Sequence, residues 1–90
     1  MKFKGAVIKE QGVTFAVVTV KKRVVDSKTE ANKTLQLFQS VFPQIPIVLM
    51  AQDLRGVPTY YGRRDISQFM ANISIQSIPW KEYTLAAENL

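Results

Sequence analysis

The chain has 90 residues, a net charge of +5, and neither histidine nor cysteine. These missing side chains are the ones most often used for proton transfer near neutral pH, for thiol chemistry and for binding zinc, iron or copper. We therefore expect no metal site and no cofactor. A hydrophobic fraction of 47% with 21% charged residues is typical of a globular protein, and predicts one domain over residues 1–90, with residues 86–90 as a frayed tail.

Composition also bears on location. The longest uninterrupted apolar stretch, residues 45–51, is far shorter than the roughly 20 residues that a membrane-spanning helix needs. The lysine-rich start of the chain contains no signal-peptide apolar run, and the absence of cysteine fits a reducing compartment. We expect a soluble, cytoplasmic protein with no membrane partner.

The first third of the chain predicts a β-hairpin. Residues 3–8 alternate weakly and indicate an edge strand, and Gln11 with Gly12 is typical of a hairpin turn. Residues 13–25 are rich in valine, which favours a strand over a helix along the whole run. The first half of this run is apolar on both faces, as expected for a central strand covered on both sides.

The next segment predicts a helix followed by a second central strand. Ser27 and Glu30 fit a capping box, and an apolar stripe follows until Pro43 ends the helix. Residues 45–51 are again apolar on both faces and indicate a strand. A strand, a helix and a strand in this order predict two parallel strands joined by a right-handed crossover. The stripe consists of Ala31, Leu35, Phe38 and Phe42.

The last part of the chain repeats this pattern in shorter form. Residues 57–61 indicate a short strand, which Pro58 restricts to an edge or a strand start. Asp65 is predicted to cap a second helix with the apolar stripe Ile66, Phe69, Met70 and Ile73. Residues 78–83 indicate either a final short strand or a loop packed down by Trp80. Together the elements predict a small two-layer α+β domain of order strand-strand-helix-strand-strand-helix, with a mixed sheet.

The expected oligomeric state depends on which faces of the sheet the two predicted helices cover. If both helices cover the same face of this sheet, the other face is left as a bare apolar patch of the kind that marks an interface. We expect a homodimer on this ground. If the helices are divided between the two faces, a monomer suffices.

The densest polar cluster is the strongest candidate site. Guanidinium groups offer a planar fork of donors to a phosphate or carboxylate, and tyrosine rings stack on ligands. The alternative is structural, with Asp65 capping a helix and the arginines forming surface ion pairs. The candidate ligand-binding residues are Gln52, Asp53, Arg55, Tyr60, Tyr61, Arg63 and Arg64.

Three classes of function follow from these observations. The favoured one is a small non-enzymatic binding or protein-interaction module, whose Arg/Tyr/Asp loop binds an anionic small molecule or protein. The first alternative is nucleic-acid binding, because all of the excess positive charge lies in residues 1–45. On a strand, however, Lys22 would face away from Lys21 and Arg23. The second alternative is an enzyme using Asp53, Tyr60 and Arg63, although its serines have no histidine to activate them.

One short segment resembles a known family. Residues 56–62, Gly-Val-Pro-Thr-Tyr-Tyr-Gly, precede a helix and resemble the segment around the cis-proline of thioredoxin-like and glutaredoxin-like proteins. The resemblance implies a cis bond at Pro58. Because no active-site cysteine is present, it implies no redox activity.

Overall fold

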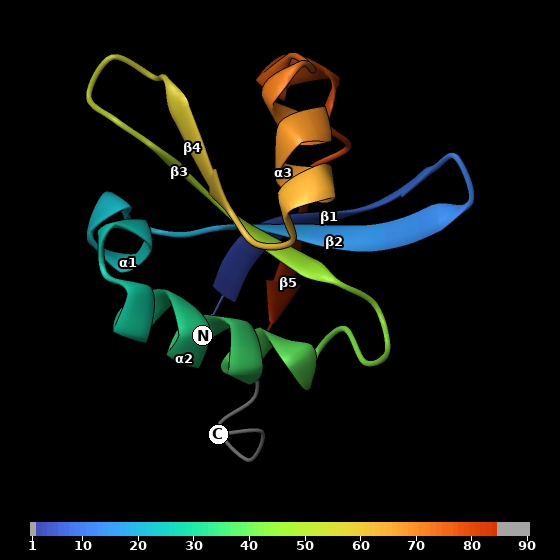
Figure 1. Ribbon diagram of the computed structural model, residues 1–90, viewed down its shortest axis with the longest axis horizontal. Coiled ribbons are helices and arrows are strands. Elements are labelled where there is room, and N and C mark those ends of the chain that lie inside the picture. The colour runs from blue at the N-terminus through green and yellow to red at the C-terminus, as the bar shows by residue number, and fades with distance from the viewer. Residues whose placement is uncertain (1, 85–90) are drawn as a thin grey trace.

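The computed structural model describes residues 2–84 and arranges five strands in one mixed sheet, in the order β4-β3-β2-β1-β5 (Figure 1). β2 and β3 are parallel, and the other neighbours are antiparallel. The predicted α+β class, mixed sheet and short final strand are confirmed, whereas the tail at residues 86–90 lies outside the described part. The elements are β1 (Lys2–Glu10), β2 (Val13–Thr19), α1 (Lys22–Asp26), α2 (Lys28–Gln39), β3 (Ile47–Gln52), β4 (Pro58–Tyr61), α3 (Arg64–Ala71), the 3-10 turn η1 (Ile75–Ser77) and β5 (Lys81–Thr84).

The helices lie on opposite faces of the sheet (Figure 1). The domain therefore has three layers, where two were expected. Because β2 and β3 are apolar on both faces, they need cover on both sides, and the divided helices supply it. The bare apolar face that motivated the expected homodimer is thus covered. One cluster joins α1 and α2 to Ala16, Val18, Ile47 and Leu49 of the sheet, and the other joins α3 to Phe15, Val17, Val48 and Met50.

The β1–β2 hairpin forms as predicted, but β1 is not an edge strand along its whole length. The two turn residues Gln11 and Gly12 have φ angles of 51° and 80°, as a two-residue hairpin turn requires. β5 pairs with residues 2–5 of β1 and β2 with residues 5–10, so Gly5 lies between two paired strands. Beyond Gly5, β1 keeps one free edge.

The segment after β2 corrects the prediction of a strand to residue 25. β2 ends at Thr19, and Lys22–Asp26 form one helical turn, α1. In this turn Val24 and Val25 pack against the α2 side of the core, and Lys22 pairs with Asp26 at 2.6 Å. Tertiary packing thus overrides the strand preference of valine. The basic triplet beginning at Lys21 consequently opens a helix and does not alternate along a strand.

α2 begins where the sequence predicts and ends earlier. The Ser27 Oγ accepts the backbone N–H of Glu30 at 3.3 Å, which confirms the cap. The helix ends at Gln39, four residues before the proline expected to stop it. The Gln39 side chain then donates to the carbonyls of Phe42 and Ile45, at 2.7 and 3.0 Å, and holds the connection to β3. Phe42 remains in the core despite lying outside the helix.

Candidate functional site

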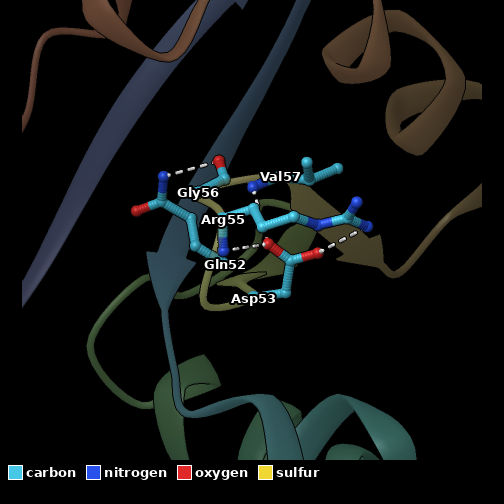
Figure 2. Close-up of polar contacts among 5 residues, drawn as sticks. All are labelled: Gln52, Asp53, Arg55, Gly56 and Val57. Atoms are coloured by element: carbon cyan, nitrogen blue, oxygen red, sulfur yellow. Dashed lines mark hydrogen bonds and ion pairs between the residues drawn. The ribbon is translucent and has the colours of Figure 1, made fainter.

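The β3–β4 loop uses its polar side chains to hold its own shape (Figure 2). Asp53 Oδ1 accepts the backbone N–H groups of Arg55 and Val57, at 2.8 and 3.0 Å. Gln52 Nε2 donates to the carbonyl of Gly56 at 2.9 Å, and the Gly56 φ of +84° favours glycine. These contacts are those of an aspartate-organised turn, so Gln52 and Asp53 are engaged in the fold of the loop.

Arg55 projects from this loop into solvent. Its side chain is 86% exposed, and its guanidinium lies 3.9 Å from Asp53 Oδ2. An ion pair this exposed contributes little to stability. The peptide bond before Pro58, at the base of the loop, is trans, which corrects the cis bond implied by the resemblance to thioredoxin-like proteins.

The two tyrosines of β4 point to opposite faces of the sheet. Tyr60 packs with the α3-side cluster and Tyr61 with the α2-side cluster. The Tyr61 hydroxyl donates to Asn32 Oδ1 at 3.0 Å. The Tyr60 hydroxyl is buried and has no hydrogen-bond partner within residues 2–84, and this burial raises the pKa of Tyr60 above its usual value of 10.0. Adjacent strand residues alternate between faces, so the pair cannot line one pocket.

Arg63, Arg64 and Asp65 lie at the other end of β4, at the start of α3. Arg63 donates twice to the Asp65 carboxylate, from Nε and from a terminal nitrogen, both at 2.8 Å. This bond holds the pKa of Asp65 down at about 2 and raises that of Arg63. Asp65 is the second residue of α3 and accepts the N–H of Ile66 at 2.9 Å. Asp65 is therefore not the predicted N-cap. The N-cap residue is Arg63, whose side chain forms no capping hydrogen bond.

The predicted cluster is thus divided among three places. Gln52, Asp53 and Arg55 form the β3–β4 loop, the tyrosines lie on opposite faces of β4, and Arg63 with Arg64 begins α3. Antiparallel pairing of β3 with β4 puts the loop and the start of α3 at opposite ends of the four-residue strand β4. At about 3.4 Å per residue this separation is more than 10 Å, so one small ligand does not contact all three groups.

A different feature has the properties of a binding surface. Beyond residue 5, the side of β1 that faces away from β2 has no neighbouring strand within the described chain. A groove of about 380 Å³ runs beside this open edge. It combines a strand edge that β5 does not cover with a mostly apolar wall. The groove is lined by Val7, Ile8, Lys9 and Glu10 of β1 together with Phe69, Ile73, Ser77, Ile78 and Pro79.

The sequence contained a partial signal for this edge. The sequence predicts residues 3–8 as an edge strand, and in the structure β1 has nine residues, whereas β5 has four and cannot pair along all of β1. Which half of β1 remains open depends on the register of Lys2 opposite Thr84. That register joins the two ends of the chain and has no local signature.

Comparisons with known proteins add no functional information. No family model, curated protein or solved structure matches this chain. Within residues 2–84, no helix is long and apolar enough to cross a membrane, and no three acidic side chains gather in a way that suits a metal ion.

Proposed function

We propose that the protein is a non-enzymatic interaction module that takes an extended segment of a partner protein as an additional strand beside residues 6–10 of β1. The observation that carries this proposal is the open strand edge next to an apolar groove. In strand addition, main-chain hydrogen bonds supply affinity, and pockets for alternate side chains supply specificity. The open half of β1 offers both.

The chemistry of the groove defines the partner segment. A segment that pairs with this edge lies end to end with β5, and every second side chain points toward α3. On that side the wall is formed by Phe69, Ile73 and Ile78, which favours apolar side chains at alternate positions. Val7, 44% exposed at the edge itself, offers a further apolar contact. We therefore propose an extended partner of about five residues with alternating apolar side chains.

The dispersal of the Arg/Tyr/Asp cluster supports a binding function over catalysis. Asp53 is engaged with its own loop, Tyr60 is packed beneath α3, and Arg63 is held by Asp65. An enzymatic reaction at these groups needs them within hydrogen-bond reach of one substrate. Their contacts favour a structural role for the loop, and the proposed site moves to β1.

We place the expected homodimer at the same edge. Because the helices cover both sheet faces, a second copy has the open part of β1 available for symmetric antiparallel pairing. A partner segment and a second copy then compete for one surface. The lack of cysteine is consistent with our further proposal that this exchange takes place in the cytoplasm.

The test is selection of ten-residue peptides from a random display library, followed by NMR mapping of the selected peptides. We expect amide shifts concentrated at residues 6–10, and loss of binding in Val7→Lys, since an edge lysine opposes strand addition. Val57→Lys is the matched control, because Val57 is 52% exposed in the β3–β4 loop. Shifts centred on residues 52–65 would instead assign binding to the Arg/Tyr/Asp loop.

Analytical ultracentrifugation tests the dimer separately. The wild type is expected to sediment as a dimer at micromolar concentration and to become monomeric with Val7→Lys or with a selected peptide. A wild-type monomer would remove the homodimer while leaving partner binding intact, and a dimer unaffected by Val7→Lys would place self-association on another surface.

A further inference from the structure

Three lysines line a second groove, at the opposite end of β1 from the groove beside its open edge. Lys2 and Lys4 belong to β1, and Lys21 follows the end of β2. All three line a shallow groove of about 360 Å³, together with Phe3, Thr19, Val20 and Glu82. The Thr19 hydroxyl donates to the carbonyl of Lys4 at 3.1 Å and ties the two strands together at this point.

The charge of this groove is positive and largely uncompensated. Lys2 lies 3.7 Å from Glu82, but their side chains are 72% and 62% exposed, so the attraction is weak. Within residues 2–84, Lys4 and Lys21 have no acidic side chain in ion-pairing range. The remaining ion pairs of the described chain are local and lie elsewhere, between Lys22 and Asp26, Arg55 and Asp53, and Arg63 and Asp65.

Two of the lysines leave β1 on one face, and the third follows the end of β2 in the same groove. Lys2 and Lys4 are two residues apart on one strand, so their side chains leave the same face about 7 Å from each other. Lys21, beyond the end of β2, adds a third ammonium group to the same groove. Several ammonium groups in one groove suit a chain with regularly repeated negative charges. A single small anion gains less, because in a shallow groove it stays hydrated.

The lysines of the groove act as point charges. The groove contains no arginine, so it lacks the planar fork that orients a phosphate or carboxylate, and its ammonium groups contact phosphate as point charges. The exposed large apolar side chains of the described chain, Val7, Leu54 and Val57, do not line the groove, so it has none to insert into a lipid surface. Phe3 is 8% exposed and packs in the α2-side core, so it offers no face for base stacking.

We propose that the groove of Lys2, Lys4 and Lys21 binds the phosphate backbone of a nucleic acid, without preference for base sequence. This function is independent of the strand-addition site on β1. Binding then arises from counterion release and depends steeply on salt.

The test is fluorescence anisotropy with a labelled 20-nucleotide single strand and the matching duplex. Three phosphate contacts predict a slope of log K against log salt of about −2 for the single strand and about −2.7 for the duplex. Between 50 and 200 mM salt, affinity then falls roughly 20-fold for the single strand and roughly 40-fold for the duplex. A slope near zero would overturn the proposal.

Variants of equal charge separate the groove from net charge. The double variant Lys4→Gln/Lys21→Gln is expected to lower the slope for the single strand to about −0.7, leaving one phosphate contact. Lys28→Gln/Lys33→Gln removes the same charge from exposed positions of α2 and should retain most of the slope. Glu82→Gln removes the competing carboxylate and should tighten binding. Equal losses in the two double variants would overturn the proposal.

Two further probes distinguish other anions. Vesicles containing phosphatidylserine should bind no more tightly at 150 mM salt than vesicles of phosphatidylcholine. Inorganic phosphate at 10 mM should displace the oligonucleotide no better than sodium chloride of equal ionic strength. Strong retention on the anionic vesicles would assign the lysines to a membrane surface, and specific displacement by phosphate would assign them to a small anion. Either result would overturn the proposal.

Discussion

Adjacent tyrosines in β4 are expected to respond oppositely to loss of their hydroxyl groups. The Tyr60 hydroxyl is buried without a hydrogen-bond partner in the described chain, whereas that of Tyr61 donates to Asn32 at 3.0 Å. Burying an unpaired hydroxyl costs about 1–3 kcal/mol. Tyr60→Phe keeps the ring and removes this cost, so we expect the free energy of unfolding to rise by about 0.5–2 kcal/mol. Tyr61→Phe loses an exposed bond and should lower it by about 0.5 kcal/mol.

Urea and thermal unfolding measure these differences, because 1 kcal/mol shifts the melting temperature of a domain this size by about 4–8 °C. A pH series provides a second readout. Since burial raises the pKa of Tyr60 in the folded state, the unfolded chain releases this proton first, and stability falls as the pH rises above about 10. Tyr60→Phe should make this decline shallower. If Tyr60→Phe instead cost more than about 1 kcal/mol, the hydroxyl would have a bonding role that its surroundings do not show.

Three other changes test the core, the backbone and the surface charges. Phe38→Ala should cost about 3–5 kcal/mol in urea unfolding, because Phe38 is 3% exposed. Gln36→Ala, on the exposed face of α2, is the control and should be nearly neutral. A small loss of stability in Phe38→Ala would contradict the place of Phe38 in the core. Gly62→Ala should cost about 2–3 kcal/mol, because the added Cβ would lie 2.9 and 3.1 Å from backbone atoms of β3. Gly12 has a φ of +80° and open space around it, so Gly12→Ala should cost only about 1 kcal/mol. If the two glycine variants lost equal stability, the close approach of Gly62 to β3 would be refuted. The Asp65 carboxyl should titrate by NMR at about pH 2. Its contribution to stability should be present above pH 4 and lost as the pH falls toward 2. A titration midpoint at the usual value of 3.8 would mean that Arg63 does not stabilise the Asp65 carboxylate.

Part of this fold could be predicted from the sequence because it depends on local interactions. The Gln11 and Gly12 turn and the Ser27 cap depend on residues within a few positions of each other, and both form as predicted. Phe38 and Ala31 lie on one stripe because the helical period is fixed. The alternation of strand residues also predicts that Tyr60 and Tyr61 face opposite ways, although the proposed cluster had placed them together.

Contacts between distant segments decided the rest. Val24 and Val25 enter a helix because the core beneath α2 receives them there, which no local preference of valine reveals. The loops that connect strands to helices place α2 and α3 on opposite faces of the sheet (Figure 1). Neither sheet face is then bare, whereas the expected dimer was based on a bare face. The open half of β1 exists because β5, from the other end of the chain, pairs with residues 2–5 alone. Lysines 2, 4 and 21 likewise share a groove only after two strand ends meet. Local chemistry thus determined the elements, whereas the tertiary structure determined which surfaces they leave free.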